Sequence, residues 1–375
     1  MRVAPVPRWA DSVMVATRSD TQSDTHHPPE GSPMRVLITG AGGYVGSRLV
    51  PALLEAGHEV TATSTDPARL ARFGWHEHVV TAALDVQDRG TIEQTVADHD
   101  AVYFLVHALD GSDFRERDRA GAHHLGEAAR DAGVGRVVYL SGLVPDVSRE
   151  DLSEHILSRL EVEEILGGYA PTTTLRAAIL IGGGSTSFEI IRQLSERLPV
   201  QTVPTWMKSQ VEPIAVVDAV AALVAALDVP AATRSYDIGS GETMPYADLL
   251  RVYADVAGVT RQQADVPGLP TDVVGLLAGL LTDVPAGTVR ALVASLHHDM
   301  VCRERDFMED LLPDHAFVPL REAVERALRD DEEDGDPMAL LPTDPVWAGG
   351  RDHGAAGSLV ARAAETVTRV ADRLV

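Results

Sequence analysis

Several residue types are scarce in this chain, and each scarcity narrows the class of protein. Cys302 is the only cysteine, so an internal disulfide cannot form, and the chain suits a reducing compartment. No apolar run reaches the roughly 18 residues of a membrane-crossing helix. The N-terminal region also lacks the apolar stretch of a secretory signal. We therefore expect a cytoplasmic protein that does not enter a membrane.

Positive charge is also scarce. The 375 residues include 32 Lys and Arg against 56 Asp and Glu, which gives a formal net charge of −24 at pH 7. An acidic surface repels phosphate backbones and anionic lipid, so nucleic acid and membrane are not expected partners. Lys208 is the only lysine, and asparagine is absent altogether. These two absences restrict which catalytic side chains the chain can present.

Strand and helix patterns alternate from Met34 to Gly182. Compact apolar runs of strand length are followed by segments with helical spacing. The expected strands are 34–39, 58–64, 78–84, 101–109, 136–143 and 172–182, and the expected helices are 45–57, 91–100, 115–133 and 150–168. This alternation predicts an α/β fold, in which helices cover both faces of a doubly wound parallel sheet.

The motif "TGAGGYVG" (39–46) joins the first expected strand to the first expected helix. Gly40 permits a tight turn, Gly43 lets the backbone approach a pyrophosphate, and Gly46 lets the helix pack closely on the sheet. The helix N-terminus, which includes Tyr44 and Val45, offers free N–H groups to an anion. The context of strand, turn and helix predicts a dinucleotide-binding site of Rossmann type.

The rest of the chain divides by composition. We expect residues 1–33 to be a disordered extension and 34–182 to be the dinucleotide-binding Rossmann domain. Residues 183–328 should form a smaller, mainly helical substrate-binding part, with 265–325 mostly helical. Residues 329–375 should contain an acidic linker (329–337) and an amphipathic helix (358–375). That helix is expected to pack on the body of the protein or on a second subunit, as in a homodimer.

Further segments resemble a known family. Together with the glycine motif, Asp85–Val86 and "VVYLSG" (137–142) resemble a short-chain dehydrogenase/reductase. The segments "LRAAILIGGGS" (175–185) and "PIAVVDAV" (213–220) are similar to its extended and atypical branches, the NAD(P)H-binding, NmrA-like group. The resemblance covers about residues 34–330. It implies that Asp85 and Val86 lie against the adenine of the cofactor, and that Leu105, Val106 and His107 pass along the adenosine and ribose.

The identity of the cofactor, NAD or NADP, remains open at this point. The resemblance implies an acid at position 64 for NAD or an arginine at position 65 for NADP, but the chain has Ser64 and Thr65. Arg69 and Arg72 lie one turn further on and could reach a 2′-phosphate, although solvated arginines are the simpler interpretation. The sequence thus predicts NAD and NADP affinities within about tenfold of each other.

The expected catalytic residues are only partly present. The resemblance implies an Asn–Ser–Tyr–Lys set, but the chain has no asparagine, and Lys208 lies far from the relevant helix. Ser141 stands where the family has its serine, and His155 and Arg159 have the spacing of the Tyr and Lys. A histidine exchanges protons near neutral pH, and an arginine, although it does not titrate there, could hold a ribose hydroxyl. The alternative is that both are ordinary polar residues on a half-exposed helix.

Two hypotheses follow from this sequence. One is an oxidoreductase or epimerase with a non-standard catalytic site at Ser141, His155 and Arg159, acting on an unidentified small molecule. The other is an inactive nucleotide-binding sensor or scaffold. The histidine-rich spots at 75–78, 123–124 and 297–298 lack the spacing of metal ligands, so we expect no metal site.

Overall fold

The structure is a computed structural model that describes residues 32–108, 111, 113–198, 200–265, 275, 278–329 and 335–350. Three expectations fall wholly or largely outside these residues. They are the disordered extension up to residue 31, the centre of the acidic linker (330–334) and the amphipathic helix at 358–375.

A seven-stranded sheet forms the centre of the fold, with the strand order β11-β6-β5-β4-β1-β2-β3. Every pair in it is parallel. The strands are β1 (Arg35–Thr39), β2 (Glu59–Ser64), β3 (Val80–Ala83), β4 (Ala101–Phe104), β5 (Arg136–Gly142), β6 (Thr172–Ala177) and β11 (Arg234–Ile238). The order reverses between β1 and β4, where a doubly wound sheet has its ligand crevice. The predicted fold class is confirmed.

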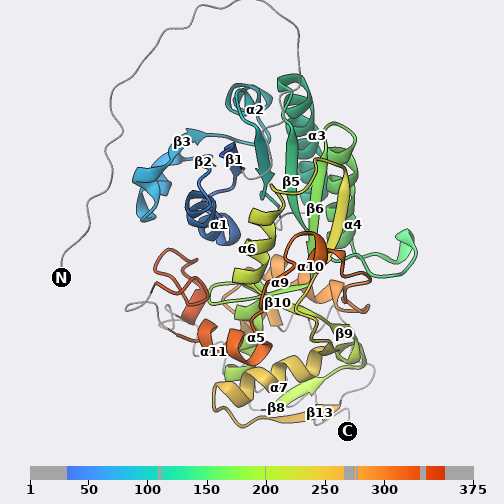
Figure 1. Ribbon diagram of the computed structural model, residues 1–375. Helices are drawn as coiled ribbons and strands as arrows, with labels where there is room; N and C mark the ends of the chain where they lie inside the picture. The colour runs from blue at the N-terminus through green and yellow to red at the C-terminus, as the bar shows by residue number, and fades with distance from the viewer. Residues whose placement is uncertain are drawn as a thin grey trace, which may run out of the picture.

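Side chains of alternate strand residues build two cores, one on each face of the sheet. Val36, Ile38 and Tyr103 belong to one core, and Leu37 and Phe104 belong to the other. Figure 1 shows the helices that cover the two faces. The first core is covered by α1 (Tyr44–Glu55) and α6 (Val216–Ala225), and the second by α2 (Arg89–Val96), α3 (Phe114–Ala132) and α4 (Glu154–Gly167).

The sixth expected strand is divided in the structure. β6 ends at Ala177, and β7 (Ile179–Ile181) pairs instead with β10 (Pro213–Ala215). The edge beside β6 is taken by β11, in which Tyr236 is opposite Leu175. The sheet therefore takes its last strand from well beyond residue 182, and the expected boundary between 182 and 183 does not separate the sheet from the rest of the chain.

The remaining elements form the lower part of Figure 1. The helices are α5 (Thr186–Arg197), α7 (Tyr246–Val256), α9 (Ala286–Ser295), α10 (Asp306–Asp310) and α11 (Leu320–Ala327). Short sheets pair β8 (Val200–Val203) with β13 (Gln262–Asp265) and β9 (Gln210–Val211) with β12 (Met244–Pro245). Irregular segments at 296–305 and 311–319 make the region 265–325 less helical than expected. Among the described residues, no helix combines the length and apolarity needed to cross a bilayer.

The segment that follows the acidic run packs on the body of the protein. Arg48 of α1 forms a buried ion pair with Asp344, with 2.9 Å between Nη1 and Oδ1, and its Nε donates to the Pro337 carbonyl. Met338 is fully buried, and Asp336 accepts two hydrogen bonds from Arg326. At the described end of the expected linker, Gly335 and Pro337 are exposed, as the expectation of a solvated run implies, while Asp336 is held by Arg326.

Candidate active site

The glycine motif forms a bare turn between β1 and α1. Gly40 has a φ of +70°, a conformation that glycine adopts without strain. A Cβ added at Gly46 would lie 2.5 Å from the Gly40 carbonyl oxygen, and one at Gly43 would lie 3.2 Å from it. Gly43 is also the N-cap residue of α1. The turn therefore has no side chain between the backbone and a ligand, as binding of a pyrophosphate requires.

Two cavities flank this turn, and most of the residues predicted to contact the cofactor line one of them. The first, of about 340 Å³, is lined by Gly40, Gly43, Ser64, Thr65, Asp85, Val86 and Val106, among others. The second, of about 260 Å³, is lined by Gly40, Gly43, Tyr44, Val45, Gly46, Leu105, Ser141, His155 and Arg159, among others. The first lies at the ends of β2 and β3, and the second lies towards β5 and α4. The structure thus brings the predicted residues together around one turn.

The second cavity contains polar atoms without partners. Within the described part of the chain, the hydroxyls of Ser141 and Tyr44 and the Nε of Arg159 are buried and have no hydrogen-bond partner. Arg159 is held by another atom, because its Nη1 donates to the Leu140 carbonyl at 2.8 Å. Buried polar groups in native proteins are nearly always paired, so these atoms indicate a ligand that brings its own donors and acceptors. The ribose hydroxyls and carboxamide of a nicotinamide nucleotide are groups of this kind.

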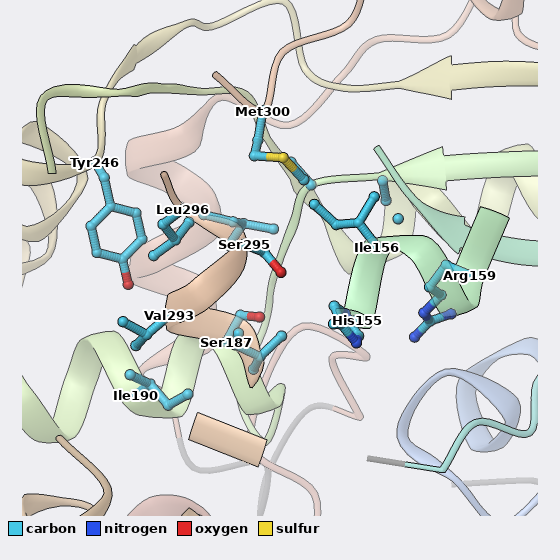
Figure 2. A pocket seen from close by; sticks show the side chains of 15 residues that line it. His155, Ile156, Arg159, Ser187, Ile190, Tyr246, Val293, Ser295, Leu296 and Met300 are labelled. Carbon is cyan, nitrogen blue, oxygen red and sulfur yellow. The ribbon is translucent and has the colours of Figure 1, made fainter. Parts of the chain in front are cut away.

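His155 lies on α4, whose start differs from the prediction. The Ser153 hydroxyl accepts the Ile156 N–H, so α4 begins at Glu154 rather than near 150. Figure 2 shows His155 and Arg159 one turn apart on the same face of this helix. The His155 side chain is buried, with 9% of the residue exposed, and both residues line the second cavity. His155 therefore lies on the buried face of a half-exposed helix, and its catalytic role stays a prediction.

His155 is the end of a hydrogen-bonded chain. Its Nδ1 lies 3.3 Å from Nε2 of His107, and Nδ1 of His107 lies 2.7 Å from Oδ2 of Asp118. Asp118 also accepts hydrogen bonds from the Ala108 N–H and the Ser158 hydroxyl, both at 2.9 Å. We call these three side chains the Asp118–His107–His155 chain.

The hydrogen positions in this chain follow from its acid end. An ionised carboxylate only accepts hydrogen bonds, so Nδ1 of His107 carries the proton between them. Nε2 of a neutral His107 is then an acceptor, and Nδ1 of His155 must be the donor. This leaves Nε2 of a neutral His155 without a proton, in the form of a general base.

The pKa values of the three groups agree with this arrangement. Burial lowers the pKa of His155 well below its usual 6.5, and the charges of Arg159 and His107 add to the effect. Burial lowers the pKa of His107 to about 4, although Asp118 acts in the opposite direction. Burial alone would raise the pKa of Asp118, but its hydrogen bonds, chiefly from His107, lower it. At neutral pH the chain is therefore one carboxylate and two neutral imidazoles.

His107 lines a third cavity, of about 270 Å³, and neither of the two cavities beside the glycine turn. Asp85, Val86 and Val106, which the resemblance also places along the adenosine, line this third cavity too, so the placement of His107 beside the adenosine and ribose stays a prediction. Asp118 holds the segment after β4, because it binds both the His107 ring and the Ala108 backbone. The sequence analysis missed Asp118 and Ser158, because only the packing of α3 against α4 brings them together.

The first cavity has a basic wall. Arg69 and Arg72 both line it, on the short 3-10 helix Pro67–Arg72 that follows β2. Asp66 is not among its lining residues, and its carboxylate accepts the Ala68 N–H at 3.2 Å. Arg72 also stacks on Phe73, with its Cζ 4.9 Å from the ring centroid. Both arginines are exposed, as the interpretation of solvated side chains implies, and both also line the first cavity.

No metal centre accompanies this site in the described ranges. There, no three His, Cys, Asp or Glu side chains gather closely enough to hold a metal ion.

Comparisons with known proteins agree with this geometry. Residues 40–170 match the model of a family described as NAD(P)H-binding. A 3-beta-hydroxysteroid dehydrogenase of Mycolicibacterium neoaurum is 32% identical over 116 residues, which are 28% of this chain and 31% of that protein. The match thus spans about a third of the length of this curated relative.

Two solved structures show the extent of the fold. A nucleoside-diphosphate-sugar epimerase of Staphylococcus aureus superimposes with a TM-score of 0.63 at 13% identity, covering 78% of this chain and all of that one. The enzyme WbmH of Bordetella bronchiseptica, solved in complex with NAD+, gives a TM-score of 0.58 at 20% identity and covers 79% of this chain and 98% of that one. Residues 40–170 therefore match a family described as NAD(P)H-binding, and the chain shares its fold with these two solved structures.

Proposed function

We propose that the protein is an NADP(H)-dependent oxidoreductase that acts on a secondary alcohol or its ketone, with His155 as the proton-transfer residue. The observation that carries this proposal is the Asp118–His107–His155 chain, which ends at the cavity beside the glycine turn. A fixed base next to a nucleotide cavity is the arrangement that hydride transfer from an alcohol requires. An epimerase that begins by oxidising a hydroxyl would use the same first step.

The residues present fit a nicotinamide dinucleotide. The bare glycine turn suits the pyrophosphate, and Ser141 and Arg159, each with a buried polar atom that has no hydrogen-bond partner, line the cavity on the α4 side. Arg159 would hold a ribose hydroxyl, the task that the family gives to lysine. A bound NADP+ supplies the acceptor for the hydride that leaves the alcohol carbon.

The proton moves through the side chains of this protein. His155 accepts the hydroxyl proton at Nε2 and passes the proton on its Nδ1 to Nε2 of His107. Asp118 then stabilises the positive charge on the His107 ring, at a distance of 2.7 Å. The Ser141 hydroxyl would donate a hydrogen bond to the substrate oxygen, because Ser141 lines the cavity together with His155. At neutral pH His155 is unprotonated, which is the form that accepts the proton in alcohol oxidation, whereas ketone reduction needs the protonated form.

The proposal predicts substrate-dependent reduction of the cofactor. Purified protein with NADP+ should form NADPH when a suitable secondary alcohol is added from a panel of aliphatic and cyclic compounds. The absorbance of reduced nicotinamide measures the reaction, and calorimetry measures cofactor binding in parallel. Binding without turnover on any alcohol or ketone would favour the sensor or scaffold hypothesis instead.

A second prediction concerns the choice of cofactor. The weak discrimination expected from Ser64 and Thr65 should be replaced by a preference for NADP, because Arg69 and Arg72 line the cavity on the side of β2. Hydrogen bonds to charged groups contribute about 1.5 to 3 kcal/mol, which corresponds to roughly ten- to a hundredfold in affinity. Arg69→Ala should weaken NADP binding by about this factor and leave NAD binding nearly unchanged.

The control for this variant is Arg321→Ala. It removes the same side chain from α11, where Arg321 is exposed and does not line the nucleotide cavity. Titration calorimetry with NADP+ and NAD+ measures both affinities. Equal weakening for the two nucleotides, or none for NADP+, would show that Arg69 does not read the 2′-phosphate.

A further inference from the structure

We infer that the substrate carries a compact apolar group, and that this group occupies a separate pocket next to His155. The inference rests on the proposed oxidoreductase function and names the class of its substrate. Figure 2 shows this pocket between α4, α5 and α9, with His155 and Arg159 at one end. It is not part of the nucleotide-binding turn, because none of the motif glycines lines it.

The pocket continues from the cavity that contains the proposed base. His155, Arg159 and Leu292 line both spaces, so a molecule whose hydroxyl meets His155 can extend into the pocket. Its volume is about 70 Å³. An apolar cavity of about 150 Å³ takes a benzene ring, so this one suits a branched group of roughly three or four carbon atoms.

Beyond His155, Arg159 and the hydroxyl-bearing Ser187, Tyr246 and Ser295, the walls are apolar. They include Ile156, Ile179, Ile190, Val293, Leu296 and Met300, from several elements of the fold. Ser295 also lines the pocket, but its hydroxyl is bonded to the Ser153 hydroxyl and to the Ala291 carbonyl, both at 3.1 Å. Apart from His155 and Arg159, only the hydroxyls of Ser187 and Tyr246 remain as partners there, too few for the many polar groups of a sugar or phosphate, whereas an alkyl group would gain burial.

The few charged side chains of the pocket favour a neutral substrate over a nucleotide-linked sugar, which carries negative charge. His155 and Arg159 are the only titratable side chains of the pocket apart from the Tyr246 phenol, and burial raises the pKa of that phenol, so it stays neutral. The single fixed charge, Arg159, lies at the end shared with the cofactor cavity. The geometry therefore points to a neutral secondary alcohol, R–CHOH–CH₃, with a compact alkyl group as R.

A series of alcohols tests the pocket. Propan-2-ol, butan-2-ol and 4-methylpentan-2-ol differ only in the alkyl group, and each buried methylene should raise kcat/KM roughly fourfold. Over three added carbons the gain should reach about fiftyfold. UDP-glucose, the charged comparison, should give no turnover. Equal kcat/KM across the series, or a preference for UDP-glucose, would overturn the inference that the pocket binds an alkyl group. The oxidoreductase proposal would remain.

Substitutions at Leu296 test whether the size of the pocket, rather than the hydrophobicity of the alcohol alone, determines kcat/KM. Leu296 is partly exposed, so Leu296→Trp should fold and fill the space, and it should remove the gain for 4-methylpentan-2-ol while sparing propan-2-ol. Leu296→Ala should enlarge the pocket and extend the series to longer alkyl groups. The control is Leu280→Trp, at a leucine that is 57% exposed and outside the pocket. If both variants fold and their kcat/KM values for the three alcohols keep the wild-type order and ratios, the inference is contradicted.

Binding without turnover gives an independent measurement. Saturation-transfer NMR with 4-methylpentan-2-one should show contact of its isobutyl protons with the wild-type protein and weaker contact with Leu296→Trp. If this difference appears but no alcohol is oxidised, the pocket stands and the oxidoreductase proposal fails. If neither contact nor turnover appears, both fail.

Discussion

Replacing His155 with phenylalanine should reduce the kcat for alcohol oxidation roughly hundredfold or more, which is the usual scale of a lost acid–base group. The phenylalanine ring occupies similar space at this buried position but cannot accept a proton. NADP binding should change little, because Arg159 and the glycine turn are unaltered. His123→Phe is the control, at an exposed histidine of α3 outside both cavities.

The same account fixes the direction of the pH dependence. The pKa of His155 lies well below 6.5, so the base form dominates at neutral pH. Oxidation by the wild-type protein should stay on a plateau from neutral pH to below 6.5 and decrease only at lower pH, where His155 becomes protonated. From the sequence alone, His155 was expected to titrate near neutral pH. Its burial in the structure lowers its pKa, so the titration moves to lower pH. A decrease centred at or above 6.5, or turnover unaffected by His155→Phe, would assign the proton to another group.

A second large effect is expected at the glycine turn. Gly43→Asp should weaken NADP binding by roughly a hundredfold or more, equivalent to about 2.7 kcal/mol. The added carboxylate would repel the pyrophosphate at the N-terminus of α1, and its Cβ would lie 3.2 Å from the Gly40 carbonyl. Calorimetry measures the affinity, and circular dichroism verifies the fold.

Two variants accompany this measurement. Gly43→Ala adds the Cβ without the charge and should have a smaller effect. Gly74→Asp adds the same side chain where nothing lies within 4 Å of the new Cβ, outside the lining of the nucleotide cavity, and should bind NADP normally. Full affinity in a folded Gly43→Asp protein would rule out the turn as the pyrophosphate site.

The sequence could predict the features that depend on local pattern. The alternation of strands and helices gave the parallel sheet, and the spacing of Gly40, Gly43 and Gly46 located the turn that both cavities border. The spacing of His155 and Arg159 also survives in the structure, because residues four apart share one face of a helix.

Features that depend on packing between distant segments could not be predicted in this way. Asp118 is one of many acids on a charged helix, and only the approach of α3 to α4 makes it the partner of His107. β11 joins the sheet from position 234 because the edge of β6 is free there, which no local pattern shows. The place of Arg69 depends on the 3-10 turn after β2, capped by Asp66.

The most direct test of the central claim is a crystal structure of the protein with NADP+ bound. The account predicts the pyrophosphate on the turn of Gly40, Gly43 and Gly46, the 2′-phosphate beside Arg69, and the nicotinamide in the cavity lined by Ser141 and His155. The hydrogen bond between His155 and His107 should be retained. A nicotinamide ring bound away from this cavity, or a His155 side chain turned out of it, would contradict the assignment of His155 as the proton-transfer residue.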